Sequence, residues 1–163
     1  MIRNMMSNSN KGLGTTDVLP VDQTRIEVLN GTVDYKNIPL GSYDILGRFA
    51  SAGQRDYTEE LNLIQSMGFN AYRISISWAR IFPSGEELQP SEEGLKYYEA
   101  IIDDVLEKDI EPIVTLSHFD LPLNLYEKYG AWKSRKMIEL FERYAEAVFQ
   151  HFKDKVKYWI TFN

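Results

Sequence analysis

The chain has 163 residues, 44% hydrophobic and 26% charged, with a formal net charge of −6. Such a composition is typical of a soluble globular domain, and the acidic balance argues against a nucleic-acid partner, which favours a concentrated basic surface. The absence of cysteine excludes disulfides, thiolate catalysis and Cys-ligated zinc. His118 and His151 are too few for a histidine-built metal site, and nothing in the sequence calls for a cofactor.

Two further features concern location. No apolar run approaches the ~20 residues of a membrane span, and the first ten residues lack the apolar core of a signal peptide. We therefore expect a cytoplasmic protein with no membrane partner, and the sequence leaves oligomerisation open.

The chain divides into two segments. Residues 1–52 are irregular, rich in Asn, Ser, Gly and Thr at first and then interrupted by glycines and a proline. The Gly12-Leu-Gly14 stretch follows no strand pattern and completes no phosphate-loop motif, so it indicates a turn. We predict an irregular N-terminal segment over 1–52 and a partial (β/α) barrel domain over 53–163.

Regular elements begin after residue 55. Apolar spacing predicts a helix from Asp56 to Met67, ended by Gly68, and then a strand from Asn70 to Ile76. A long Pro- and Gly-rich loop from Trp78 to Pro90 is expected next. Ser91 is placed to cap a second helix, whose buried stripe is Leu95, Tyr98, Ile102 and Val105.

The second half repeats this order. Glu111 to Leu116 is apolar enough for a strand covered on both faces, and a short helical turn is expected at Leu123 to Tyr129. Ser134 is expected to cap a third long helix, and Val156 to Phe162 predicts a last strand. Strands separated by helical crossovers are parallel, which fits an open doubly wound sheet or part of a barrel. Without a glycine-rich phosphate loop, the α/β barrel is favoured.

Polar side chains gather where the predicted strands end, which is where (β/α) barrels carry their chemistry. Arg73 lies in the first strand, His118 follows the second and Asn163 ends the third. Each alone is more often structural, but three on one face, with Trp78 and Trp132 in the neighbouring loops, favour a site. Such a set suits sugars, because His and Asn bind hydroxyls and an indole packs on the sugar's C–H face.

The carboxylates do not supply a catalytic pair. Four adjacent pairs lie on helices or in the long loop, where a solvated surface is the expected position: Glu59-Glu60, Glu86-Glu87, Glu92-Glu93 and Asp103-Asp104. Asp120 follows His118 closely, but a role in fixing the loop is expected for it rather than a catalytic one. The residues therefore indicate the binding part of a site without its acid and base.

Four motifs occur in order along the chain: YRISISWARIFP (72–83), EPIVTLSHFDLP (111–122), YGAW (129–132) and VKYWITFN (156–163). Together they resemble the signatures of glycoside hydrolase family 1, the β-glucosidases and 6-phospho-β-glucosidases. Residues 11–20, KGLGTTDVLP, resemble a stretch of the bacterial 6-phospho branch more loosely. Phe119 in place of the Trp common in plain β-glucosidases, and the loop after Asp120, also favour the phospho branch.

The resemblance implies the N-terminal portion of a (β/α)8 TIM barrel and a glycoside hydrolase that cleaves β-glucosides, plain or 6-phosphorylated, by the retaining two-glutamate mechanism. It implies that His118, Asn163, Phe119 and Trp132 bind substrate and that Arg73 supports the nucleophile. The acid/base Glu is expected directly after Asn163, so neither catalytic Glu is in this chain. We expect the 163 residues alone, a fragment of the family's fold, to be inactive.

Several departures keep alternatives open. The family's opening Gln-x-Glu-Gly segment is absent, the run before the first helix is reduced to Gly53-Gln-Arg-Asp56, and Ala131 replaces a glycine, a minor change if its φ is negative. A non-catalytic sugar-binding or interaction module built from half a barrel is one alternative. An unrelated (β/α) enzyme using Glu111 or Asp120 is another.

Overall fold

The computed structural model describes residues 12, 14, 15, 32 and 57–163. Nearly all of the predicted N-terminal segment, 1–52, therefore lies outside the described residues. Within the long described range, six helical segments and three strands follow one another along the chain: α3 (Tyr57–Ser66), β1 (Ala71–Ser75), α4 (Trp78–Ile81), α5 (Glu92–Glu107), β2 (Glu111–Ser117), α6 (Leu123–Tyr129), η4 (Ala131–Lys133), α7 (Lys136–Phe152) and β3 (Tyr158–Phe162).

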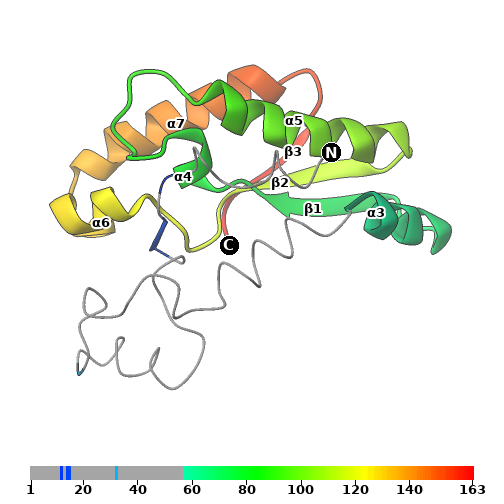
Figure 1. Cartoon of the computed structure of the whole chain (residues 1–163), viewed down its shortest axis with the longest axis horizontal. Coiled ribbons are helices and arrows are strands. Elements are labelled where there is room, and N and C mark those ends of the chain that lie inside the picture. The colour runs from blue at the N-terminus through cyan, green and yellow to red at the C-terminus, as the bar shows by residue number, and fades with distance from the viewer. Residues whose placement is uncertain (1–11, 13, 16–31, 33–56) are drawn as a thin grey trace.

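The strands form one parallel sheet in the order β1-β2-β3, as the helical crossovers predict (Figure 1). The register pairs Ser75 with Thr115 and Thr115 with Ile160, and Ser117 lies opposite Phe162. All three strands consequently end at the same edge of the sheet. Three consecutive strands in sequential order are what part of a (β/α)8 barrel requires.

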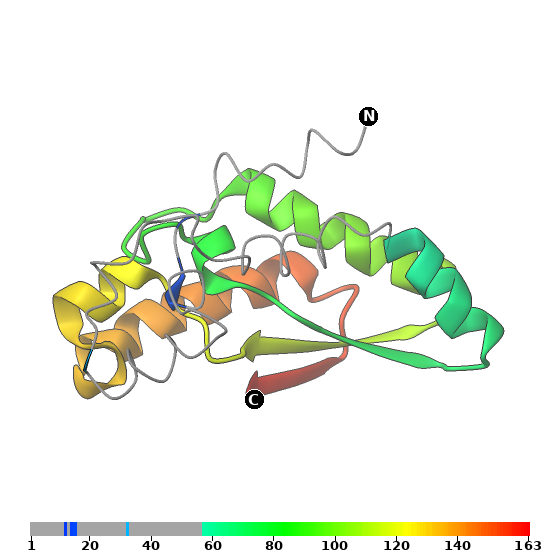
Figure 2. The ribbon, with the colours of Figure 1, turned by 60° about the horizontal axis from the view of Figure 1, so that its bottom comes forward.

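Helices α5 and α7 cover one face of the sheet (Figure 2). Their buried stripes pack against Ile76, Val114 and Leu116 of the first two strands in a single core cluster. The predicted stripe of α5 is fully confirmed, and α7 buries Met137, Leu140, Tyr144, Val148 and Phe152. In the part of the chain that the structure describes, no helix is long and apolar enough to cross a membrane.

Two local predictions about helix starts have different outcomes. Ser91 caps α5 as expected, since its side chain accepts a hydrogen bond from the backbone N–H of Gly94 at 3.1 Å. Ser134, in contrast, lies one residue before the N-cap position of α7, which Arg135 occupies. Its hydroxyl still accepts from the N–H of Lys136 at 3.2 Å.

The predicted loop from Trp78 to Pro90 is wrong at its beginning, where α4 forms a single helical turn. Trp78, Ala79 and Ile81 of this turn are all buried, and the N–H of Phe82 donates to the carbonyl of Trp78 at 2.8 Å. Burial of three apolar side chains in four residues stabilises a turn that is too short to show a helical period.

The turn between α6 and η4 holds an unusual backbone conformation. Gly130 has φ 67° and Ala131 has φ 54°, so both residues are left-handed. Replacement of the family's glycine by Ala131 is expected to be minor if φ is negative. The positive φ shows that this condition is not met. A residue with a Cβ pays roughly 1–2 kcal/mol in this region, so Ala131 is strained.

Ala131→Gly should stabilise the chain by roughly 0.5–1 kcal/mol, because relief of the left-handed strain exceeds the added chain entropy of glycine. Gly130→Ala is the reciprocal control: a Cβ there would come no closer than 3.8 Å to any other atom, so its loss of stability would be purely conformational. Urea unfolding followed by circular dichroism measures both. A destabilised Ala131→Gly variant would contradict the strain.

Candidate functional site

Arg73 joins the three strands near their carboxyl ends. Its Nε donates to the hydroxyl of Thr115 on β2 at 2.8 Å, and its guanidinium also donates to the Oδ1 of Asn163, which directly follows β3. The backbone N–H of Asn163 donates to the carbonyl of Ser117 at 2.9 Å. Arg73 and Asn163 are both exposed, so these predicted site residues meet on an accessible surface.

His118 lies beside this pair, just beyond β2. The hydroxyl of Ser75 on β1 is 3.0 Å from its Nδ1, and the imidazole is otherwise exposed. Because this contact engages one ring nitrogen, Nε2 remains available to a ligand hydroxyl, with no hydrogen-bond partner among the described residues. Ser75 and Thr115, which sequence reasoning missed, therefore orient the two polar groups that it found.

Aromatic side chains border the polar group. Phe119 is 71% exposed, has φ 62° and lies edge-on to His118 with ring centroids 5.4 Å apart. Trp132, on η4, is 48% exposed, and its ring centroid is 5.4 Å from that of Phe162, the neighbour of Asn163. We call Trp132 and Phe162 the rim aromatics. They give the site an accessible apolar border of the kind that sugar C–H faces contact.

Trp78 does not belong to this border, which corrects the expectation from sequence. It is 1% exposed and stacks on Tyr144 with ring centroids 5.1 Å apart. The indole lies in the hydrophobic core because α4 turns it toward α7 instead of carrying it out on a loop.

Two buried tyrosine hydroxyls hold the strand ends, and the sequence did not reveal this role. The hydroxyl of Tyr144 donates to the carbonyl of Leu116 at 2.8 Å and lies 3.3 Å from that of Ile76. The hydroxyl of Tyr98 accepts from the N–H of Ser77 at 2.8 Å. Burial raises the pKa of Tyr98 to about 12 and that of Tyr144 well above its ordinary value. Both groups therefore stay neutral hydrogen-bonding anchors.

The loop after β2 is also tied to β1. The hydroxyl of Ser77 donates to a carboxylate oxygen of Asp120 at 3.1 Å, in keeping with a loop-fixing role for Asp120. Gly14 and Thr15 reach the same loop, since the N–H of Thr15 donates to the carbonyl of Leu121 at 2.8 Å and Gly14 forms an antiparallel bridge with Pro122. The residues next to His118 are thus held by partners distant in sequence.

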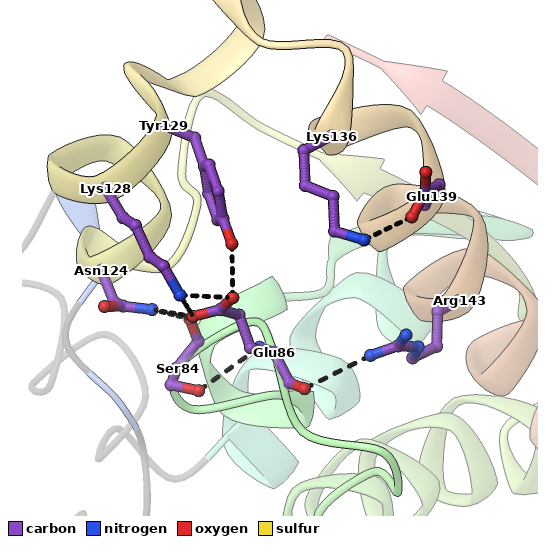
Figure 3. Close-up of polar contacts among 8 residues, drawn as sticks. All are labelled: Ser84, Glu86, Asn124, Lys128, Tyr129, Lys136, Glu139 and Arg143. Carbon is purple, nitrogen blue, oxygen red and sulfur yellow. Dashed lines mark hydrogen bonds and ion pairs between the residues drawn. The ribbon is translucent and has the colours of Figure 1, made fainter.

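Glu86, in the loop before α5, makes the densest polar contacts near the rim (Figure 3). Its carboxylate accepts from the hydroxyl of Tyr129 at 2.6 Å, from Lys128 Nζ at 2.9 Å and from Asn124 Nδ2 at 3.1 Å. These hydrogen bonds, that of Tyr129 first, lower the pKa of Glu86 to about 2. Glu86 is therefore ionised across the physiological range.

The prediction that the carboxylate pairs form solvated surfaces is wrong for Glu86-Glu87, whereas the side chain of Asp103 is 44% exposed, as expected, and also forms an ion pair. Glu87 accepts from the N–H of Ser84 at 2.7 Å, and Asp103 pairs with Lys155 at 2.7 Å. The partners of Glu86 and Asp103 are distant in sequence, so residue spacing gave no signal for these contacts. Among the described residues, no group of three or more His, Asp or Glu side chains is arranged to hold a metal ion.

The arrangement defines a class of protein: consecutive units of a (β/α) barrel with an Arg-Asn-His polar group and an aromatic border at the carboxyl ends of the strands. Comparison with known proteins agrees. The sequence profile described as Glycosyl hydrolase family 1 matches residues 35–163. The chain belongs to glycosyl hydrolase family 1.

The most similar proteins include bacterial and plant enzymes. Aryl-phospho-β-D-glucosidase BglH of Bacillus subtilis (strain 168) is 44% identical over 153 residues, which are 94% of this chain and 30% of BglH. β-Glucosidase 25 of Oryza sativa subsp. japonica is 52% identical over 107 residues, 66% of this chain and 21% of that protein. A family 1 β-glucosidase from Thermotoga maritima superposes with a TM-score of 0.64 and 43% identity, covering 68% of this chain and 24% of that one. The chain thus spans under a third of the length of these relatives.

Tyr144→Phe should destabilise the fold by about 1–3 kcal/mol, because it removes the buried donor to the Leu116 carbonyl and leaves the ring packing intact. Chemical unfolding measures the loss. Tyr158→Phe, at a side chain 56% exposed, is the matched control and should stay within about 0.5 kcal/mol of the wild type. Equal effects of the two substitutions would refute the anchoring role.

The Glu86 cluster also predicts a pH dependence. A folded-state pKa of about 2, below the ordinary 4.5, adds stability that is fully present above pH 4.5 and is lost as the pH falls toward 2. The difference in unfolding free energy between wild type and Glu86→Gln should therefore be constant from pH 7 to 5 and shrink on further acidification. Denaturant titrations at several pH values test this, and a difference that grows in acid would exclude it.

Proposed function

We propose that this chain supplies the glycone-binding part of a retaining β-glucosidase that acts on 6-phospho-β-glucosides. The observation that carries the proposal is the convergence of Arg73, His118 and Asn163 at the carboxyl edge of a family 1 sheet. A guanidinium and an amide supply positive charge and hydrogen bonds, and an imidazole can bind a hydroxyl, so the chemistry of the three groups is proposed to be binding and charge stabilisation.

Each residue has a distinct part in this proposal. His118 binds a glycone hydroxyl through the Nε2 that its contact with Ser75 leaves available. Asn163, oriented by Arg73, binds the 2-hydroxyl, and Arg73 also holds the nucleophilic carboxylate ionised by charge pairing. Phe119 and Trp132 contact the apolar side of the substrate.

The mechanism in the whole enzyme is double displacement. One glutamate attacks the anomeric carbon and forms a glycosyl ester as the other protonates the departing aglycone oxygen. Water then attacks the anomeric carbon as the second glutamate takes its proton, and the bond to the first glutamate breaks to release that carboxylate, so two inversions retain the configuration. We assign the acid/base glutamate to the position directly after Asn163 and the nucleophile to later sequence, and we propose that the 163 residues bind and orient substrate without cleaving it.

The preference for a 6-phosphorylated sugar rests on the N-terminal segment. The alignment with aryl-phospho-β-D-glucosidase BglH extends over 94% of the chain, whereas that with rice β-glucosidase 25 covers 66%. Phospho-glycosidase relatives align over either 94% or 66% of the chain, so alignment length alone does not separate the two branches. The preference is supported by the relatives that align over 94% of the chain, which are named as phospho-β-glucosidases or a phospho-cellobiase. The higher identity to the rice protein over 107 residues reflects the shared barrel motifs and does not separate the two substrates.

The purified chain should bind 4-nitrophenyl β-glucoside weakly and release no nitrophenol. His118→Ala should weaken binding by about tenfold, the equivalent of one lost hydrogen bond. His151→Ala is the control, because His151 lies on α7 beside Glu99, 3.5 Å away, and away from the strand ends. NMR titration measures binding and absorbance measures hydrolysis; turnover by the chain alone would refute the assignment of both glutamates to later sequence.

The phosphate preference needs its own measurement. The reading frame after Asn163 should be sequenced and, if it continues with Glu and further β/α units, expressed whole and assayed on 4-nitrophenyl β-glucoside and its 6-phosphate. The phosphorylated substrate should be hydrolysed with the larger kcat/KM. Faster cleavage of the plain glucoside would overturn the phospho preference and leave the glycosidase proposal intact.

A further inference from the structure

We propose that Glu86 is a positioning residue that holds Trp132 at the rim of the site, a role that rests on the proposed function for its consequence in sugar binding. Glu86 itself lies away from the strand ends and touches none of the polar site residues in the described structure. It acts through the helix that it fastens.

The contacts of Glu86 fall on the end of α6 that leads to Trp132. Lys128 and Tyr129 are the last two residues of α6, and Gly130, Ala131 and Trp132 follow directly. Figure 3 shows both side chains pointing at the Glu86 carboxylate, with Asn124 joining from one turn earlier. One carboxylate therefore fixes the helix immediately before the turn that sets the direction of the indole.

The backbone of the loop that carries Glu86 is itself held in place. Arg143 of α7 donates to the backbone carbonyl of Glu86 at 3.3 Å and to that of Glu87 at 3.0 Å. Within the loop, the carboxylate of Glu87 accepts from the N–H of Ser84. The loop between α4 and α5 is thus anchored to α7, and the Glu86 carboxylate connects this loop to α6.

The turn needs such an anchor. Gly130 and Ala131 both have positive φ, and a left-handed alanine persists only where surrounding contacts impose it. The indole of Trp132 touches the rings of Phe141 and Phe162, with centroids 5.5 and 5.4 Å away, but these contacts hold only the side chain. Backbone hydrogen bonds close the turn, from the N–H of Gly130 to Tyr126 at 2.9 Å and from that of Ser134 to Ala131 at 3.1 Å. Glu86 adds a side-chain restraint on the helix that precedes them.

The test compares Glu86→Ala with Glu139→Gln in the full chain. Glu139 is a matched control, because its carboxylate pairs with Lys136 inside α7 and does not reach the loop (Figure 3). Acrylamide quenching of the folded protein reports the accessibility of Trp132, isolated by subtracting the signal of Trp132→Phe in each background. A merely structural role would lower the unfolding free energy without changing quenching in the native state.

Glu86→Ala should raise the quenching constant of Trp132 roughly twofold, because a half-exposed indole that becomes fully exposed doubles its accessible area. Glu139→Gln should leave it unchanged. An unchanged Trp132 signal in folded Glu86→Ala overturns the proposal. Should that variant not fold, Tyr129→Phe, which removes a single hydroxyl, decides in the same way with a smaller expected rise.

The sugar measurement separates this inference from the proposed function. If Trp132 responds to Glu86→Ala but the wild type binds no 4-nitrophenyl β-glucoside, the positioning role stands and the binding function fails. If the wild type binds and Trp132 does not respond, the reverse holds. Where both succeed, Glu86→Ala should weaken sugar binding and Glu139→Gln should not.

Discussion

The structure depends on the burial of one sheet face against α5 and α7, with two tyrosine hydroxyls set into that core. Apolar side chains bring the helices onto the strands but do not determine where each strand stops. Tyr144 reaches the carbonyls of Leu116 and Ile76, and Tyr98 takes the N–H of Ser77, so backbone groups at the carboxyl ends are satisfied from inside the core. Because an unpaired buried carbonyl is costly, this pairing fixes the edge at which the site forms.

Successive side chains along each strand point to opposite faces of the sheet, so they enter either the hydrophobic core or the polar site. Ile74 of β1 and Ile76 just after it pack against or into the core, whereas Arg73 and Ser75 reach Thr115, Asn163 and His118. Every polar site residue is thus held by a neighbour on an adjacent strand. The geometry of the site follows from parallel register, and the loops contribute mainly the aromatic border.

Much of the fold and the positions of the polar site residues could be predicted from sequence, because these features depend on local sequence patterns. The stripe of α5, the Ser91 cap and the three strands follow from periodicity and turn chemistry, and Arg73, His118 and Asn163 follow from their places at strand ends. Trp78 was misplaced because a single helical turn is too short to show a period, so nothing in the pattern separated core indole from loop indole. The predicted boundary at 52 concerns residues outside the described part.

Glu86 shows why the remainder escaped sequence reasoning. Its carboxylate meets Asn124, Lys128 and Tyr129 across about forty residues, on an element whose position depends on the whole α/β layer. No rule of residue spacing relates Glu86 to these three partners. From the sequence alone, an adjacent Glu-Glu pair in a loop is expected to be solvated, because its contact with α6 depends on the tertiary fold. A family motif marks a continuous stretch of sequence, whereas the contacts that hold its residues in place come from distant parts of the chain. The tetrapeptide Tyr129–Trp132 joins both, since its first residue binds Glu86 and its last forms the rim.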